Sequence, residues 1–265
     1  MASLPSCVLV QRIKMASSAV HGNATGAVGN MPSALAGITI AGSATAITLL
    51  FAPMYTLVMP VWNEGSVGDQ MVYAYVFALF NSVAWVLYAA MSLPGSLPFI
   101  AVNGAGILLH LCYIVFYIWF ATGRKQKHAL LLFLAAGTVS VVTAATVTCM
   151  VFTHRWSATL AAVVASASGA SVQLVPAFDV VTVVKSKQAN GTMSPAKVLI
   201  SLLNGCIWTT YGFMSVPANV YVVVPNLMGI VSSAVQIIVY LMYRHNPPDA
   251  VDDGHKLREL DASPV

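Results

Sequence analysis

Two stretches of this 265-residue chain carry the same uncommon residues in the same order. Asn81–Tyr88 reads NSVAWVLY, and Asn204–Tyr211 reads NGCIWTTY, 123 residues further along. The match continues on both sides without a gap, and uncommon residues that coincide in this way predict an internal repeat. Further coincident pairs are Pro53 and Pro176, Met91 and Met214, Pro94 and Pro217, Asn103 and Asn226, Gly106 and Gly229, and Tyr117 and Tyr240.

The composition indicates a membrane protein. Apolar residues make up 58% of the chain and charged residues only 8%, with a mean hydropathy of +0.80. A soluble domain carries roughly 25% charged residues, so a soluble enzyme, a nucleic-acid binder and a disordered chain are excluded. The chain has no HExxH, GxSxG or Gly-rich phosphate motif. We therefore predict a protein that is not an enzyme, that uses no cofactor or metal, and that lies in a lipid bilayer.

The apolar stretches predict seven transmembrane helices, since a span needs about 20 residues. They run at about 35–59, 71–93, 97–121, 129–152, 157–184, 194–216 and 218–243. The 123-residue offset carries the first three spans onto the last three and leaves the fourth without a counterpart. An offset of four spans preserves direction across the membrane, so the repeats are parallel. The predicted fold is an all-α membrane protein with two parallel three-helix bundles joined by a linker helix (3+1+3).

The repeat and the charges divide and orient the chain. We expect an extracytosolic leader and a cytosolic tail, both disordered, around two repeats and a linker, with bounds of 1–33, 34–122, 129–152, 157–244 and 245–265. Seven basic residues between 124 and 244 fall on one side of the membrane, which places the C-terminus on the cytosolic side. The membrane itself is expected to be a plasma membrane or an endomembrane. Of the two sequons, at Asn23 and Asn190, only Asn23 is then open to glycosylation.

Polar and aromatic residues inside the spans form the candidate site. Asn81 and Trp85 share one helix face with Tyr88, and Asn204, Trp208 and Tyr211 repeat that face. At 1.5 Å per residue, Trp85 lies about 12 Å deep and Asn103 about 9 Å deep. An amide at this depth must face protein or a wet cavity, because lipid would leave it unpaired. Helix packing is the alternative, but recurrence in both repeats favours one symmetric cavity lined by Asn81, Asn204, Asn103, Asn226, Trp85 and Trp208.

The chemistry of these residues favours a neutral solute. Amides donate and accept hydrogen bonds, indole faces stack on sugar rings, and no fixed charge is present to hold a carboxylate, a phosphate or a metal. Carboxylates are scarce in the spans, which favours downhill movement without a proton. Asp179 is expected to meet Lys185 or a backbone donor, or to cap the cytosolic mouth. His110, whose repeat partner is Ser233, is interpreted as a packing residue.

Other positions are suited to gating. Pro53 and Pro176 each remove a hydrogen bond to the carbonyl four residues earlier, which makes them candidate hinges. Tyr88 and Tyr211, near the outer ends of their spans, are candidates to close the cavity from that side, and a role as anchors at the membrane interface is the alternative.

The chain resembles the SWEET (MtN3/saliva) family of sugar transporters. The resemblance covers about 36–244 and is carried by GSATAITLLFAP (42–53), NSVAWVLY (81–88), NGAG (103–106), Pro176 with Lys185 and Lys187, WTTYG (208–212) and Pro225-Asn226. It implies bidirectional facilitated diffusion of a mono- or disaccharide by alternating access. It also implies that Asn103, Asn226 and Trp208 bind sugar and that Pro195 is a further hinge.

Two departures from the family pattern bear on function. The proline expected near the start of the second span is missing, and Trp85 occupies a position that is often small in long eukaryotic members. A second indole narrows the cavity, which favours a monosaccharide. The alternative is a PQ-loop-like proton-coupled carrier of amino acids or other small solutes, which the absence of a Pro-Gln dipeptide at the kinks disfavours. A seven-span receptor would not carry this repeat. Whether the protein forms a homo-oligomer is left open.

Overall fold

The computed structural model describes residues 33–68, 70, 72–91, 96–152, 157–189 and 193–245. The leader before Ser33, the tail after His245, both sequons and the Pro94-Gly95 turn lie outside these residues. The described part of the chain is helical and contains no strand.

The first repeat contains one long helix and a helical hairpin. α2 (Ser33–Pro53), the π-helical segment η1 (Met54–Val58) and α3 (Met59–Glu64) are continuous, and α4 (Tyr73–Ala90) and α5 (Leu97–Phe120) follow. α3 ends at Gly65, whose φ of 67° is the left-handed conformation that glycine favours after a helix. The first helix thus extends past the predicted end at 59.

The second repeat has the same order. α7 (Ser157–Val172) and α8 (Val175–Ser186) together form one crossing, followed by α9 (Pro195–Met214) and α10 (Val220–Tyr243). Side chains cap the last two helices: Ser194 accepts from the Lys197 N–H, and Asn219 accepts from the Val222 N–H. These caps explain why α9 and α10 begin where they do.

The linker helix α6 (Gly123–Phe152) is longer than predicted. The basic segment Arg124–His128, expected to separate two spans, forms its first turns. Arg, Lys and Gln are good helix formers, and no proline or internal glycine interrupts the segment. The basic residues therefore extend the span instead of ending it.

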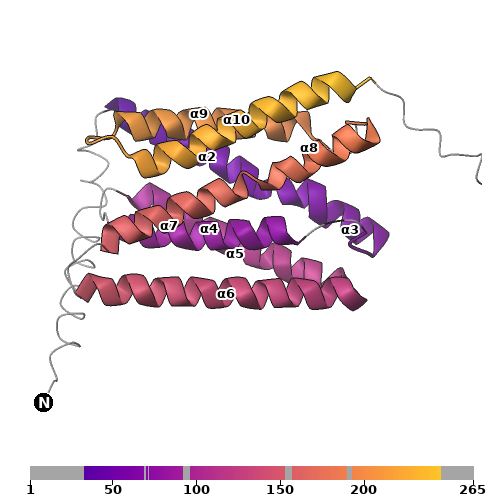
Figure 1. Cartoon of the computed structure of the whole chain (residues 1–265), viewed down its shortest axis with the longest axis horizontal. Helices are drawn as coiled ribbons and strands as arrows, with labels where there is room; N and C mark the ends of the chain where they lie inside the picture. The colour runs from indigo at the N-terminus through magenta and orange to yellow at the C-terminus, as the bar shows by residue number, and fades with distance from the viewer. Residues whose placement is uncertain are drawn as a thin grey trace, which may run out of the picture.

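Within the part of the chain that the structure describes, six helical segments are long and apolar enough to cross a membrane. They are Ser33–Glu64, Tyr73–Ala90, Leu97–Phe120, Gly123–Ala144, Ala158–Ser186 and Val220–Tyr243. α9 has 20 residues but is less apolar, because it contains polar residues such as Asn204 and Thr209, which face other helices or the interior. It must cross nonetheless, because α8 ends and α10 begins at opposite ends of the bundle (Figure 1). The crossings therefore follow the predicted seven-helix 3+1+3 order, which confirms that fold.

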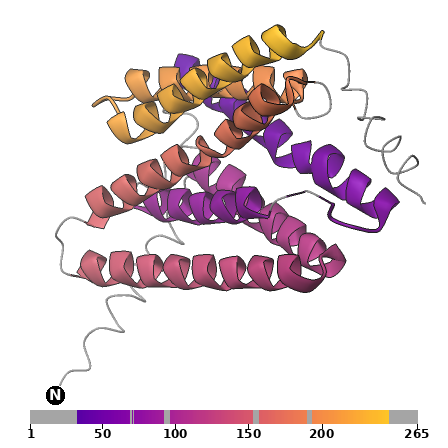
Figure 2. The same cartoon turned by 45° about the vertical axis from the view of Figure 1, so that its right-hand side comes forward.

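The helices pack with pseudo-twofold symmetry. α2 of the first repeat packs on α9 of the second, and α4 packs on α7, which is the same contact after the 123-residue offset. Within the repeats, α4 packs on α5 and α9 packs on α10. In Figures 1 and 2, α6 lies at one edge of the bundle, against α4, α5 and α7, and α9 and α10 lie at the other edge.

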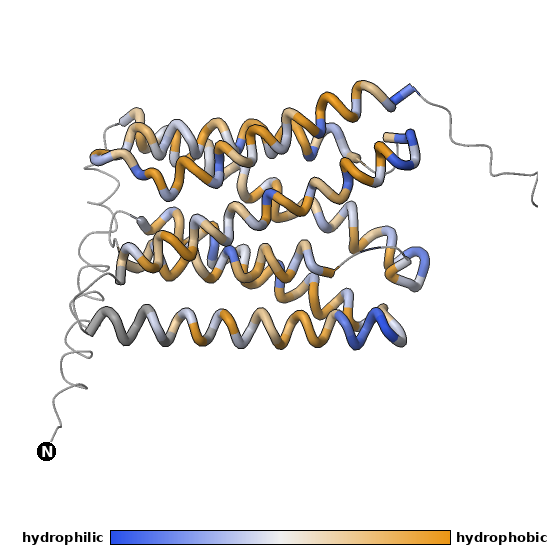
Figure 3. The backbone as a smooth tube through the Cα atoms, viewed as in Figure 1, coloured by the Kyte–Doolittle hydropathy of each residue, from blue (hydrophilic) through white to orange (hydrophobic). Residues whose placement is uncertain are grey.

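Hydrophilic residues gather at one end of the bundle, where α3 and α8 end and α6 begins (Figure 3). We call this the basic end because it carries Arg124, Lys125, Lys127, Lys185, Lys187, Lys197 and Arg244. Two exposed indoles, Trp62 on α3 and Trp119 on α5, lie near it, as is typical of a membrane interface. The other end of the bundle is called the opposite end.

Candidate functional site

A cavity of about 360 Å³ lies between the two repeats. Small-molecule sites typically measure about 300–1,000 Å³, so this cavity suits a small ligand. Both repeats contribute to its walls, and α6 does not. Its polar and aromatic lining residues are Tyr75, Asn81, Ser82, Trp85, Phe99, Asn103, His110, Gln173, Lys197, Ser201, Asn204, Trp208 and Asn226.

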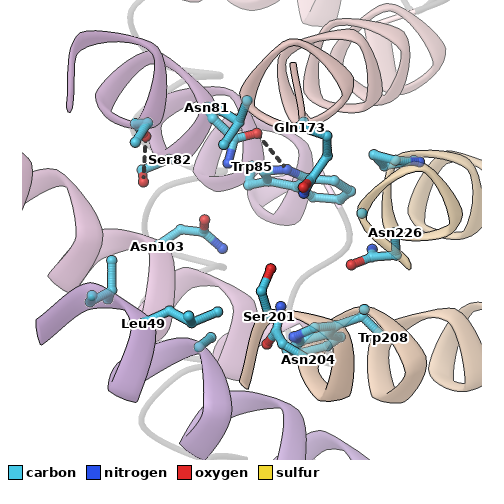
Figure 4. A pocket seen from close by; sticks show the side chains of 18 of the residues that line it. Leu49, Asn81, Ser82, Trp85, Asn103, Gln173, Ser201, Asn204, Trp208 and Asn226 are labelled. Carbon is cyan, nitrogen blue, oxygen red and sulfur yellow. Dashed lines mark hydrogen bonds between the residues drawn. The ribbon is translucent and has the colours of Figure 1, made fainter. Parts of the chain in front are cut away.

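All six predicted ligand-binding residues line this cavity. Figure 4 shows Asn81 and Trp85 on one side, Asn204 and Trp208 on the other, and Asn103 facing Asn226 between them. Trp85 and Trp208 are buried, with 8% and 7% of their surface exposed. The structure thus brings together residues that lie as far apart as 81 and 226 in the sequence.

Asn81 accepts two hydrogen bonds. The indole N–H of Trp85 donates to its Oδ1 at 3.0 Å, one helical turn away, and the hydroxyl of Ser168 on α7 donates to the same oxygen at 3.1 Å. An indole N–H can only donate, so this contact fixes which end of the amide is the oxygen. The NH₂ group of Asn81 is left for the cavity.

Asn204 makes the equivalent contact in the second repeat. The hydroxyl of Thr45 on α2 donates to Asn204 Oδ1 at 2.9 Å. Both hydroxyl-to-amide contacts join residues of different repeats, and 123 residues separate the donors as well as the acceptors. Trp208 makes no hydrogen bond to Asn204 in the described structure, so the two repeats differ at this point.

The side-chain amides of Asn103 and Asn226 use their nitrogens, not their oxygens, for contacts within the protein. Asn103 Nδ2 donates to the Phe99 carbonyl at 2.9 Å, and Asn226 Nδ2 donates to the Val222 carbonyl at 2.7 Å, each one turn back in its own helix. A carbonyl can only accept, so the side-chain oxygens of both residues are directed away from that contact. Within the described residues neither oxygen accepts a hydrogen bond, and both are available to a ligand.

Close backbone contacts hold the walls together. A Cβ at Gly42 would lie 2.8 Å from the Trp208 ring, and a Cβ at Gly106 would lie 2.7 Å from the Ser82 hydroxyl. A Cβ at Gly229, the repeat partner of Gly106, would lie 3.1 Å from Gln173. Larger residues at these positions would separate the helices that form the cavity.

Aromatic residues close the cavity toward the opposite end. The Phe99 ring lies 4.6 Å from Trp208, 5.2 Å from Tyr211 and 6.2 Å from Trp85, measured between centroids. Beyond this layer, Asn219 Nδ2 donates to the Tyr88 hydroxyl at 2.7 Å and links the two repeats. The predicted gating residues Tyr88 and Tyr211 lie at this end of the bundle, and Asn219 is a partner of Tyr88 that the sequence did not reveal.

The cavity reaches the surface at the basic end. Lys197, in the first turn of α9, is exposed and lines the cavity, whereas the lining residues near the opposite end are buried or half-buried. Asp179 interacts electrostatically with Lys197 and Tyr75. The expected partner Lys185 lies six residues further along α8, on another face. Within the described residues Asp179 forms an ion pair with neither lysine, and Lys197 acts on its carboxylate through the electrostatic field.

The three candidate hinge prolines differ in local structure. Pro53 is the last residue of α2, and the π-helical η1 follows it. Before Pro176 the helix is not merely kinked but interrupted, since Gln173 and Leu174 form a turn between α7 and α8. Pro195 is the first residue of α9, a position that suits proline. Pro53 and Pro176 line the cavity, and Pro195 lies at its mouth, two residues before Lys197.

The sequence reasoning missed several lining residues. His110, which the sequence predicts to be a packing residue, lines the cavity, and its Nδ1 has no hydrogen-bond partner in the described structure. Ser201, one turn before Asn204, could have been found by helical spacing. Gln173 and Phe99 carry no repeat signal, because their partners are Leu50 and Val222.

The chain is similar to sugar transporters of known name. A family model described as sugar efflux transporter for intercellular exchange matches residues 37–125 and again 159–248, which confirms the internal repeat. The bidirectional sugar transporter SWEET4 of Oryza sativa subsp. indica is 28% identical over 225 residues, covering 84% of this chain and 85% of the relative. The Arabidopsis thaliana protein of the same name is 27% identical over 212 residues, covering 79% and 82%.

One solved structure is also similar. It is that of a eukaryotic SWEET transporter at 3.7 Å resolution, with a TM-score of 0.68 and 22% identity. The match covers 79% of this chain and 96% of that chain. At this level of identity the likeness shows the fold.

Proposed function

This chain belongs to the family of sugar efflux transporters for intercellular exchange, and from that premise we propose that it carries a small neutral sugar across a membrane in either direction, down the concentration gradient of the sugar. The family consists of transporters, not enzymes, and the chain is a multi-pass integral membrane protein. The relatives named above are called bidirectional sugar transporters, which supports sugar over the amino acids of the PQ-loop alternative.

The observation that carries the proposal is the cavity between the repeats. The side-chain amides of four asparagines and of Gln173, together with two indoles, surround a volume that suits a small ligand. Among the described lining residues Lys197 is the charged one, and it lies at the mouth. A polyhydroxylated neutral molecule satisfies amides that both donate and accept, whereas an anion or a cation would lose hydration without gaining an opposite charge.

We propose uniport rather than coupling to protons. In the described spans, acids occur at Glu64, at the end of α3, and at Asp179, beside Lys197. Proton-coupled carriers keep carboxylates in the transport path, and the six candidate binding residues include none. The substrate gradient alone then drives movement.

Alternating access is supported by a cavity closed at one end and open at the other. We propose that residues 34–122 and 157–244 rock against each other, with 129–152 as linker, around hinges at Pro53, Pro176 and Pro195. Tyr88 and Tyr211 then gate the opposite end, and Asp179 the basic end. The positive-inside rule assigns the basic end to the cytosol and the N-terminus to the outside, so the described conformation opens to the cytosol.

Uptake of labelled hexose in transport-deficient cells, with and without a proton uncoupler, tests this function. Wild-type uptake should persist with the uncoupler, and Asn103→Ala or Asn226→Ala should abolish it. Asn63→Ala, at an exposed position near the end of α3, is the matched control and should transport normally. Uptake that collapses with the proton gradient would contradict uniport, and a glycan on Asn190 would contradict the orientation.

We further propose that the second indole restricts the substrate to monosaccharides. Trp85 and Trp208 both line the cavity, and each is in contact with the aromatic layer around Phe99. Trp85→Ser should enlarge the cavity and allow disaccharide uptake while glucose transport continues. A variant that still moves glucose but gains no disaccharide uptake would exclude this role.

A further inference from the structure

Two hydroxyl groups hold the cavity amides across the boundary between the repeats. Thr45 on α2 contacts Asn204 on α9, and Ser168 on α7 contacts Asn81 on α4, at 2.9 and 3.1 Å. Each hydroxyl also lies 3.0 or 2.8 Å from the backbone carbonyl oxygen three residues earlier in its own helix, so its single proton is shared between that carbonyl and the amide oxygen. Neither hydroxyl residue lines the cavity, so each acts on a ligand only through the amide in front of it.

The hydrogen bonds give the amides of the four cavity asparagines a defined direction. Asn81 and Asn204 use their oxygens for protein contacts, which leaves NH₂ donors for the cavity. Asn103 and Asn226 use their nitrogens, which leaves two oxygen acceptors. Donors and acceptors therefore alternate around the space that Figure 4 shows between these side chains.

On the basis of the proposed function, we propose that Thr45 and Ser168 are positioning residues that fix this order of donors and acceptors for the sugar. A ligand that fits must accept hydrogen bonds from one pair of amides and donate to the other. A hydroxyl group both donates and accepts hydrogen bonds, so a compact polyol such as a hexose ring matches this arrangement. An analogue that lacks the hydroxyl donor facing Asn103 or Asn226 does not match it.

The two positions are not equivalent. Asn81 Oδ1 has a second donor in the Trp85 indole, so loss of the Ser168 hydroxyl leaves the amide held in place. Asn204 Oδ1 has Thr45 as its partner in the described structure. Without that hydroxyl the Asn204 amide is free to turn its oxygen into the cavity. Loss of Thr45 should therefore impair recognition more than loss of Ser168.

The experiment measures KM and maximal rate of glucose uptake in proteoliposomes, together with uptake of a panel of monofluorinated deoxyglucoses. Fluorine cannot donate a hydrogen bond, so the panel reports which hydroxyl positions must donate. We expect Thr45→Val to raise KM about three- to tenfold and Ser168→Ala about twofold, as for loss of one hydrogen bond. Thr45→Val should also change the rank order of the fluorinated sugars. Thr45→Ser and Ser168→Thr keep the hydroxyl and should behave like wild type.

Matched controls lie one turn away on the same helices. Thr48 and Ser171 each donate to a backbone carbonyl of their own helix, so Thr48→Val and Ser171→Ala should leave KM and the rank order unchanged. If Thr45→Val matches Thr48→Val, or if it lowers only the maximal rate, the positioning role is wrong. If wild-type protein transports glucose and the variants do not differ, this inference alone fails. Wild-type protein that moves no sugar would overturn the proposed function and this inference with it.

Discussion

The two repeats share one plan but fix their cavity tryptophans differently. In the first repeat, the Trp85 indole N–H donates to Asn81. In the second, the Trp208 ring packs directly on the backbone of α2 at Gly42. The residue equivalent to Gly42 is Ala165, which has a side chain and packs near Trp85. A hydrogen bond and a close backbone approach are therefore two ways to hold an indole at the same place.

The hinge regions of the two repeats also differ in their local structure. The first crossing continues through Pro53 as a single helix with a π-helical segment, whereas the second is interrupted before Pro176. In a continuous helix the change of direction comes from altered backbone hydrogen bonding, as in the π-helical segment. In an interrupted helix it comes from the turn between the two segments. The first repeat should thus depend more on its proline than the second.

The largest effect is expected at the Gly42 contact. Gly42→Ala places a Cβ 2.8 Å from the Trp208 ring, and such overpacking costs about 1–3 kcal/mol. We expect a lower melting temperature and a strong loss of hexose uptake. Gly37→Ala is the control on the same helix, because a Cβ there meets nothing within 4 Å. Equal melting temperatures for the two variants would show that the close approach does not matter.

The second prediction compares the hinge prolines. Pro53→Ala restores an N–H inside a continuous helix and should straighten it, so initial uptake should fall several-fold. Pro176 is the second residue of α8, where the N–H faces no carbonyl of its own helix. Pro176→Ala should therefore have a smaller effect. Initial rates, normalised to the amount of folded protein in the membrane, provide the measurement, and equal losses would remove the distinction between the hinges.

The third prediction separates the two indoles. Trp85→Phe and Trp208→Phe remove the same volume, but only the first removes a hydrogen bond present in the described structure. We expect Trp85→Phe to be less stable than Trp208→Phe by about 1 kcal/mol. Thermal unfolding in one detergent tests this difference. If Trp208→Phe is the less stable variant, packing at Gly42 contributes more than the hydrogen bond.

The sequence predicted the fold and several residues that line the cavity, for a physical reason. An amide or a proline within an apolar span destabilises the helix or the protein in the membrane, so its presence there indicates a role. The repeat allows each such residue to be compared with its partner 123 residues away. This comparison identified the four asparagines that line the cavity, Asn81, Asn103, Asn204 and Asn226. The bounds of α6 and α3 were not, because basic residues at a membrane surface continue a helix as readily as they end it.

The remaining site residues were hidden because their sequence signal is ambiguous. Thr45 and Ser168 are ordinary residues in a membrane helix, where a hydroxyl is usually satisfied by its own backbone. Phe99 is apolar, so nothing distinguishes a ring that closes a cavity from one that faces lipid. His110 was excluded because it breaks the symmetry, yet a cavity between two repeats need not be lined symmetrically.

The smallest effect is expected at the opposite end, where the tyrosines also differ. Tyr88 accepts a hydrogen bond from Asn219 of the other repeat. Ser215 donates to the backbone carbonyl of Tyr211, and within the described residues the Tyr211 hydroxyl makes no hydrogen bond to the other repeat. Tyr88→Phe should therefore weaken closure by about 0.5 kcal/mol, and Tyr211→Phe should not.

A cysteine at Val222, a buried cavity position, reports this closure when the native cysteines are replaced by serine. An impermeant thiol reagent applied from the opposite end should label it about twofold faster with Tyr88→Phe than with Tyr211→Phe, since about 0.5 kcal/mol roughly doubles the open population. Equal labelling rates would mean that the aromatic layer around Phe99 closes this end without help from the hydrogen bond between the repeats.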